Sequence, residues 1–441
     1  MSEASSVQRR RLKYAATIND EALGEETESD YEFQYVDISN VDSSGTIHEI
    51  ATYRFADAPS RARRRVRDGD VIISCVRTYL QAISAIQNPP DNLIVSTGFA
   101  VVRPREGVFD AAFGKYALRE SAFLAEVEKR SVGVSYPAIN ASDLGDIPVH
   151  LPPAQSQRAI ADYLERETAR LDALVAAKER VLGLLAEKRR ALITRAVTRG
   201  LDPRAPLRDS GISSLGKIPA HWTTNHLKFI AQISYGVGDE LDKSLTSGVP
   251  LISLPNVDIE GLLHLEELGW ADLSESEKSE LLLRKGDLLF NWRNGSSAHV
   301  GKTAYFDADG EFTHVGFLLR IRFDQSRYEP RFFQALLQTL RATGYFLYTR
   351  AMVNNTFNQT ELGNLFVVVP ALAEQRAIVA YITTETVGLD AMRAATERTI
   401  VLLKERRAAL IAAAVTGQID VSTGRYYTDD AVGHRELERR Q

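Results

Sequence analysis

The sequence repeats itself over most of its 441 residues, and this duplication limits the possible folds more than any other feature. Aligned at a constant offset of 218, residues 140–202 and 358–420 are identical at about 30 of 63 positions. Gln157-Arg158-Ala159-Ile160, for example, recurs as Gln375-Arg376-Ala377-Ile378. Upstream the match is weaker but nearly in register, because Asn40-Val41-Asp42 recurs as Asn256-Val257-Asp258. The chain therefore holds two copies of one unit, each a globular part followed by a helical part.

The helical parts have the pattern of long helices. Residues 154–198 contain no Pro, one Gly (Gly183), and apolar residues spaced by three, four and seven. The second copy runs over residues 374–416, after Pro370. A helix of this length measures roughly 65 Å and needs a long partner to bury its apolar stripe. We expect the two helices to form an antiparallel coiled coil. The alternative is two separate helices, each packed on its own domain.

The globular parts have mixed α/β character. Residues 71–76, 99–102, 288–290 and 317–321 have strand composition, whereas 111–128 and 331–340 are expected to be helical. The predicted fold class is α+β, with two mixed α/β domains, two long helices and an internal pseudo-two-fold repeat. The expected divisions are a first domain at 1–153, a helix at 154–200, a linker at 201–225, a second domain at 226–371, a helix at 372–417 and a tail at 418–441.

The sequence contains no complete catalytic motif, no metal-ligand pattern and no membrane-spanning segment. Asn88-Pro89-Pro90-Asp91 lacks the aromatic residue with which amino-group DNA methyltransferases stack a flipped base. Gly295 to Thr303 has one residue too many for a phosphate loop. The eight His are scattered, and Cys75 is the single cysteine, which suits a reducing cytosol. No apolar run reaches the roughly 18 residues of a membrane span. We predict a cytoplasmic protein with no catalytic residue, no metal and no membrane contact.

The tandem arrangement resembles the specificity subunit of type I restriction–modification systems. The resemblance rests on three stretches: residues 151–160, residues 370–378, and the linker from Asp209 to Trp222. It implies that each globular part reads one half of a bipartite, asymmetric site in double-stranded DNA. It also implies that the helices set the spacer and dock two copies of a methyltransferase subunit, and that a separate restriction/translocase subunit cuts. S-adenosylmethionine would be bound by the methyltransferase subunit and not by this chain.

The first helical copy departs from the family pattern, because no acidic residue stands directly before Gln157, whereas Glu374 stands before Gln375. The subunit contacts of the two copies are therefore expected to be unequal. The alternative function is a coiled-coil scaffold with two protein- or glycan-binding heads and no role with DNA.

Candidate DNA-binding residues fall in three places. An arginine cluster suits phosphate neutralisation or, alternatively, is a solvated loop: Arg61, Arg63, Arg64, Arg65 and Arg67. Polar and aromatic residues follow matching strands: Arg77, Thr78, Tyr79 and Gln81 in the first copy, and Asn291, Trp292, Arg293, Asn294 and Ser296 in the second. A further loop precedes each helical part: Tyr136 and Asn140, against Asn354, Asn355, Asn358 and Gln359. Ordinary loop polarity is the alternative interpretation for each residue.

Candidate subunit-docking residues are polar helix positions that match in the two copies: Gln157 and Gln375, Arg158 and Arg376, Asp172 and Asp390, and Arg180 and Arg398. Identical polar positions fit two equivalent docking sites for one kind of partner. Ion pairing between the two helices is the alternative.

The net charge of −5 does not exclude DNA binding. Much of the acidity lies in residues 20–32 and 260–280, away from the candidate reading loops. We therefore expect weak DNA binding by this chain alone, with partner subunits completing a cationic clamp.

Overall fold

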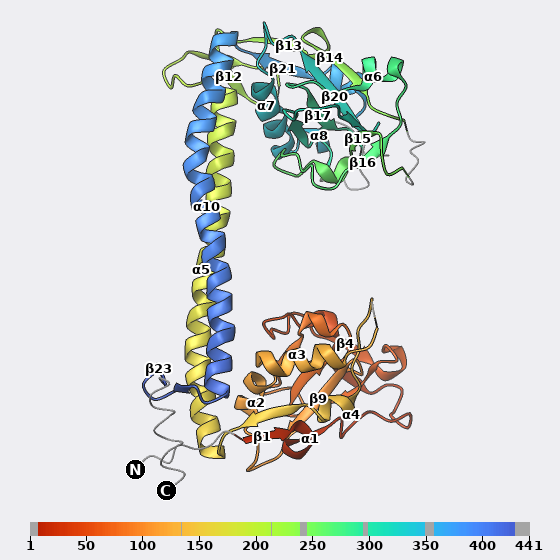
Figure 1. Cartoon of the computed structure of the whole chain (residues 1–441), viewed down its shortest axis with the longest axis vertical. Coiled ribbons are helices and arrows are strands. Elements are labelled where there is room, and N and C mark those ends of the chain that lie inside the picture. The colour runs from red at the N-terminus through yellow and green to blue at the C-terminus, as the bar shows by residue number, and fades with distance from the viewer. Residues whose placement is uncertain are drawn as a thin grey trace. The chain divides into compact units, whose positions relative to one another are not determined.

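The structure is a computed structural model, and it describes residues 8–133, 135–212, 214–238, 245–293, 299–348 and 357–427. The chain divides into two compact units, which we call unit 1 (residues 1–179 and 397–441) and unit 2 (residues 180–396). The globular part of unit 1 is red to orange in Figure 1, and that of unit 2 is green to teal. Each unit is described by itself below.

Unit 1 begins with β1 (Gln8–Arg11), α1 (Leu12–Ala15) and β2 (Ala16–Ile18). The remaining strands and helices of its globular part are β3 (Glu32–Val36), β4 (Ala51–Arg54), β5 (Ala62–Arg65), β6 (Val71–Ser74), β7 (Ile83–Ala85), β8 (Leu93–Ser96), β9 (Phe99–Pro104), α2 (Ala111–Ala117), α3 (Ser121–Arg130), α4 (Ala141–Gly145) and β10 (Pro148–Leu151). A 3-10 turn, η3 (Thr78–Leu80), lies between β6 and β7. The C-terminal end of the chain adds the hairpin β22 (Ile419–Asp420) and β23 (Arg425–Tyr426).

Unit 2 begins with the hairpin β11 (Leu207–Asp209) and β12 (Lys217–Pro219). It continues with β13 (Thr223–His226), β14 (Ala231–Tyr235), β15 (Val249–Ile252), β16 (Gly269–Ala271), α6 (Glu275–Leu281), β17 (Leu288–Asn291), β18 (Thr303–Tyr305), β19 (Thr313–His314), β20 (Leu318–Phe323), α7 (Pro330–Ala342), α8 (Tyr345–Tyr348), α9 (Gln359–Gly363) and β21 (Phe366–Val369).

The central four-stranded sheets of the two globular parts share one topology. The sheet β2-β9-β6-β7 of unit 1 corresponds to the sheet β14-β20-β17-β18 of unit 2. In both sheets the two central strands are antiparallel and in the same register, with Val71 opposite Val102 and Leu288 opposite Ile321. The outer pairs β1–β10 and β13–β21 also correspond. The duplication read from the sequence is therefore a duplication of fold, and the predicted mixed α/β class is confirmed.

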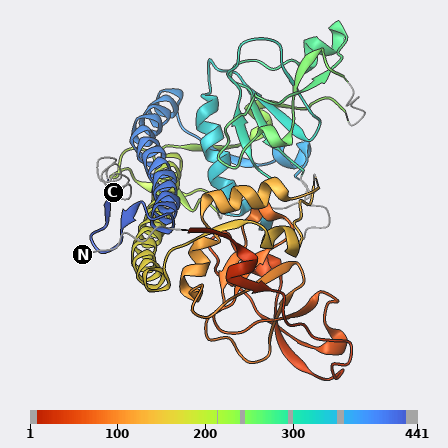
Figure 2. The same cartoon turned by 60° about the horizontal axis from the view of Figure 1, so that its bottom comes forward.

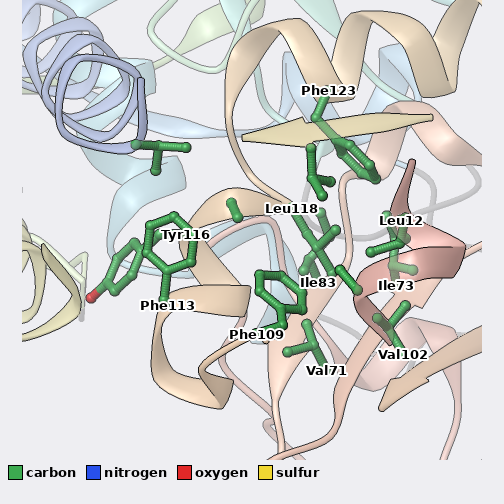
Figure 3. Packing of buried hydrophobic residues seen from close by; sticks show 14 of the residues in the cluster. Leu12, Val71, Ile73, Ile83, Val102, Phe109, Phe113, Tyr116, Leu118 and Phe123 are labelled. Atoms are coloured by element: carbon green, nitrogen blue, oxygen red, sulfur yellow. The ribbon is translucent and has the colours of Figure 1, made fainter. Parts of the chain in front are cut away.

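Each unit packs its sheet against helices around its own apolar core. In unit 1 the aromatic side chains of Phe109, Phe113 and Phe123 pack against the region of Leu12 and Val71, as Figure 3 shows. In unit 2 the corresponding core is richer in aromatic residues and includes Trp222, Phe290, Phe332 and Phe333. Leu340 and Leu337 of α7 are fully buried in it.

The two long helices are α5 (Ala154–Arg199) and α10 (Leu372–Val415). Pro152-Pro153 precedes α5, and Gly200 ends it with a positive φ of 69°, the usual conformation of a helix C-terminal glycine. In unit 1, Arg407 of α10 pairs with Asp172 of α5 at 2.9 Å. In unit 2, Arg189 of α5 pairs with Asp390 of α10 at 3.3 Å. The α5 residue has the higher number in the second pair, whereas the α10 residue has the lower number. The two helices are therefore antiparallel where they pair (Figures 1 and 2).

One predicted element is wrong in its extent. The sequence predicts one helix over residues 111–128, but the structure has two helices, α2 and α3, with a break at residues 118–120. The break arises because the carboxylate of Glu120 accepts hydrogen bonds from the backbone N–H groups of Ala122 and Phe123. Glu120 thereby caps a new helix.

Candidate functional site

Two loops meet in each unit. We call the chain that follows the central strand the post-strand loop (residues 75–82 after β6, residues 292–302 after β17). We call the chain before the short helix the pre-helix loop (residues 131–140 before α4, residues 349–358 before α9). In unit 1 the N–H of Ile139 donates to the carbonyl of Cys75 at 2.9 Å, and in unit 2 the N–H of Phe357 donates to the carbonyl of Trp292 at 2.7 Å. These four residues occupy equivalent positions of the repeat, so one backbone bond joins the two candidate loops in both units.

In unit 1 the joined loops present Arg77 and Tyr136 to solvent. The Arg77 guanidinium lies 4.8 Å from the centroid of the Tyr136 ring. Tyr136 is 64% exposed and Tyr79 is 56% exposed. Arg77 and Gln81 both have a left-handed backbone with φ of 51°, an uncommon conformation for non-glycine residues. The joined loops of unit 1 therefore have a defined shape and expose a cation, an amide and two aromatic rings.

Three candidates in these loops have structural roles. Thr78 is buried, and its hydroxyl lies 2.9 Å from the hydroxyl of Ser131. The side-chain oxygens of Asn140 and Asn358 cap α4 and α9 by accepting from the N–H groups three residues ahead. The Thr78 side chain therefore supports the loop from inside, and its contact with DNA stays a prediction. The two asparagines match in the repeat because both copies need the same helix cap.

In unit 2 the joined loops rest on an aromatic cluster. The indole N–H of Trp292 donates to the carbonyl of Gly316 at 2.7 Å, and its ring meets Tyr235 edge-on at 5.5 Å. Arg293 is exposed, and its guanidinium lies 5.8 Å from the centroid of the Phe317 ring. Asn291, by contrast, is fully buried at the end of β17, and its contact with DNA stays a prediction.

Of the remaining candidate DNA-binding residues of unit 2, one lies within the described residues and four lie outside them. Gln359 donates through its side-chain amide to the carbonyl of Ile233 at 2.6 Å. Four candidates lie outside the described residues: Asn294, Ser296, Asn354 and Asn355.

The arginine cluster of unit 1 lies on β5, an edge strand of the sheet β4-β3-β8-β5, and the turns beside it. Its members differ in their contacts. Arg63 stacks on Phe55, with 4.5 Å from the guanidinium to the ring centroid, and Arg67 pairs with Glu21. Arg61 is exposed, whereas Arg64 and Arg65 are half-buried. The members of the cluster are therefore not equally available, and Arg61, which is exposed and has no carboxylate partner among the described residues, is the candidate best suited to a phosphate.

Two docking candidates are buried. Gln157 is 1% exposed, and its amide accepts from the N–H of Asp110 and donates to the carbonyls of Val108 and Pro152. Gln375 is fully buried and accepts from the N–H of Glu329 in the same way. These side chains tie each long helix to its globular part, and the prediction that they contact a partner subunit is not tested by these bonds.

The remaining docking candidates lie on the helix surface. Asp172 and Asp390 form the interhelical ion pairs described above, which is the alternative interpretation offered for them. Arg158 pairs with Asp162 within α5 at 3.2 Å. Three further candidates are exposed: Arg180, Arg376 and Arg398.

Sequence reasoning missed a buried ion pair that occurs in both units. Arg103 binds the carboxylate of Asp70 through two nitrogens at 2.9 and 2.8 Å. Arg322 binds Asp287 likewise at 2.7 and 2.6 Å, and both carboxylates are 1% exposed. The pair holds the pKa of the Arg103 guanidinium above its ordinary value. The sequence does contain a sign of this ion pair. An Arg-x-Gly-Asp stretch ends at Asp70 and again at Asp287, and an arginine follows 33 residues after the first and 35 residues after the second.

The described residues offer no metal centre, because they contain no group of three or more His, Cys, Asp or Glu side chains placed to hold an ion. Burial raises the pKa of the Cys75 thiol to about 11, so the thiol is protonated near neutral pH. Among the same residues, no helix is long and apolar enough to cross a membrane.

The fold defines a class of tandem protein in which each copy carries a two-loop surface and continues into a long helix. Residues 60–182 match the family model described as type I restriction modification DNA specificity domain. This part of the chain is therefore similar to the DNA specificity domain of type I restriction–modification systems.

Three similar proteins illustrate the relationship. A putative type I restriction enzyme MjaX specificity subunit of Methanocaldococcus jannaschii is 29% identical over 171 residues, which are 38% of this chain and 40% of the relative. The EcoKI specificity subunit of Escherichia coli is 25% identical over 218 residues, 49% of this chain and 45% of the relative. A chain from a solved structure of a type I R-M system is 25% identical with a TM-score of 0.67, and the match covers 93% of this chain and 97% of that one. The matched stretches span less than half the length of both curated relatives.

Proposed function

We propose that this chain is the subunit that gives a type I restriction–modification complex its DNA specificity, and that it is non-catalytic by itself. Each globular part reads one half of a bipartite and asymmetric site in double-stranded DNA. The similarity to specificity subunits favours this function over a scaffold with protein- or glycan-binding heads.

The observation that carries the proposal is the backbone bond that joins the same two loops in both units. The bond joins equivalent residues, yet the exposed side chains around it differ. Unit 1 presents Arg77 and Tyr136, whereas unit 2 presents Arg293 beside the half-buried Trp292. Arginine, glutamine and aromatic side chains are suited to base edges and stacking. A constant framework with different reading residues suits two halves of a site that differ in sequence.

We also propose the partners of the helix pair. Exposed arginines recur at equivalent positions of α5 and α10, Arg158 with Arg376 and Arg180 with Arg398. Such duplicated surfaces suit two copies of a methyltransferase subunit, which would bind S-adenosylmethionine. A restriction/translocase subunit would join that complex. The six domain divisions predicted from the sequence remain part of this proposal.

The test uses the full chain in complex with the methyltransferase subunit of its own system. The complex is allowed to bind a library of random DNA duplexes, and the bound pool is sequenced. We expect an enriched motif with two specific halves and a spacer. Absence of a bipartite motif would overturn the proposal.

A second variant tests the role of the helices. One heptad is inserted into α5 and one into α10, next to the Asp172–Arg407 pair, so that seven residues add about 10 Å to each helix and keep the coiled-coil register. We expect a spacer longer by about three base pairs and unchanged half-sites. An unchanged spacer would overturn the role of the helices as a ruler.

A further inference from the structure

Arg77 is a cation in unit 1 that the fold holds in place without neutralising it. Its side chain makes no hydrogen bond and no ion pair with the residues of the described ranges. Two other arginines of this unit are neutralised by carboxylates, since Arg67 pairs with Glu21 and Arg130 pairs with Glu126. The contact of the Arg77 guanidinium is the face of the Tyr136 ring, 4.8 Å from its centroid.

The backbone beneath Arg77 is fixed on both sides. Val76 bridges to Ala138 of the pre-helix loop, and the carbonyl of Arg77 accepts from the N–H of Leu80 at 2.9 Å. The next residue, Thr78, is buried against Ser131. A left-handed non-glycine residue persists only where its surroundings determine it. The surroundings here determine the direction in which the Arg77 side chain leaves the loop.

An arginine held in this way suits recognition of a base edge. Stacking on the ring restricts the rotamers of the side chain and leaves the edge of the planar guanidinium free. That edge matches the two acceptors, O6 and N7, that guanine presents in the major groove. A phosphate contact, in contrast, positions the protein without carrying sequence information.

We propose that Arg77 reads a guanine in the half-site of unit 1, and that Tyr136 is the positioning residue that holds its guanidinium in the reading orientation. This inference rests on the proposed DNA-specificity function. In unit 2 the exposed arginine of the post-strand loop is Arg293, which lies 5.8 Å from the Phe317 ring. Arg293 therefore supplies a matched control in the other half of the site.

The experiment repeats the selection from random duplexes with the full complex carrying Arg77→Lys, Arg77→Ala, Tyr136→Phe, Tyr136→Ala or Arg293→Lys. We expect both Arg77 variants to lower the preference for guanine at one position of one half-site by about tenfold or more, with the other half unchanged. Tyr136→Phe keeps the ring and should keep the preference, whereas Tyr136→Ala should weaken it severalfold. Arg293→Lys should leave this half-site as it is.

The outcomes separate the two proposals. If the wild-type complex selects no bipartite motif, the proposed function itself fails. If the wild type selects one but Arg77→Lys leaves every position unchanged, Arg77 does not read a base. A uniform loss of affinity with a salt dependence reduced by about one ion would assign Arg77 to a phosphate and overturn the inference. Thermal unfolding of each complex checks that the exposed substitutions leave the fold intact.

Discussion

Asp172 of α5 and Arg407 of α10 form an ion pair at 2.9 Å, and the same two repeat positions pair again as Asp390 with Arg189. Each residue of the first pair becomes its counterpart in the second when 218 is added or subtracted. One kind of contact between the helices therefore serves both units, with the roles of the helices exchanged. The aspartate and the arginine that recur in both copies of the repeat therefore pair with each other across the two helices.

The ion pair is expected to contribute weakly but measurably. Asp172 is half exposed, so we expect a coupling energy of about 0.3–1 kcal/mol between Asp172→Asn and Arg407→Gln in a double-mutant cycle. Urea unfolding followed by circular dichroism measures it. Asp162→Asn is the control, because Asp162 pairs within α5 and should show no coupling to Arg407→Gln. Zero coupling for the Asp172 cycle would mean that the pair does not form in solution.

Gln157 is expected to stabilise unit 1 and not to bind a partner directly. Gln157→Leu leaves the N–H of Asp110 and two carbonyls unpaired in the interior, and we expect the free energy of unfolding to fall by about 2 kcal/mol or more. Hydrogen exchange of unit 1 measures the loss. Arg158 is the next residue in the chain and is exposed, so Arg158→Ala is the control and should change the free energy of unfolding by less than about 0.5 kcal/mol. Normal stability of Gln157→Leu with weakened subunit assembly would restore the docking role.

The buried Arg–Asp pair of unit 2 is expected to be essential to its sheet. Asp287→Asn leaves the guanidinium of Arg322 without its counter-charge, and we expect a loss of about 3 kcal/mol or more. All three tryptophans of the chain (Trp222, Trp270 and Trp292) lie in unit 2, so their fluorescence reports this loss selectively. Asp309→Asn removes the partner of Lys285 at a fully exposed site and should have little effect. Equal stability of the two variants would contradict the role assigned to Asp287.

Unit 2 is expected to lose stability in mild acid because of His314. This side chain is fully buried, and desolvation lowers the pKa of His314 from its ordinary value near 6.5 to about 4. As the pH falls from 6.5 to 4, the unfolded chain takes up the proton and the folded chain does not, so stability falls by up to about 3 kcal/mol. Urea unfolding followed by tryptophan fluorescence at pH 7 and pH 4.5 should show a steeper loss for the wild type than for His314→Asn. Parallel losses would show that another group titrates.

The general architecture is readable from the sequence because its determinants are local or repeated. The absence of Pro from residues 154–198 and the helical spacing of apolar residues indicate α5 without knowledge of its neighbours. The constant offset of 218 indicates that α10 must match it. The strands β6 and β17 follow from short runs of buried apolar residues. The break after α2 was missed, because Glu120 acts as a cap only once its carboxylate turns back to the helix start.

The sequence by itself determined that the chain is a duplicated α+β protein with two long helices and two sets of polar loops. Tertiary structure alone decided the role of individual side chains within those sets. Gln157 and Arg158 are neighbours in a block that is identical in the two copies of the repeat, yet Gln157 is buried and Arg158 is exposed. Arg77 and Tyr136 are 59 residues apart and meet only because the loops are joined at Cys75 and Ile139. The physical reason is that periodicity reports which face of an element is apolar, whereas the contacts of a polar side chain depend on segments brought together from distant parts of the chain.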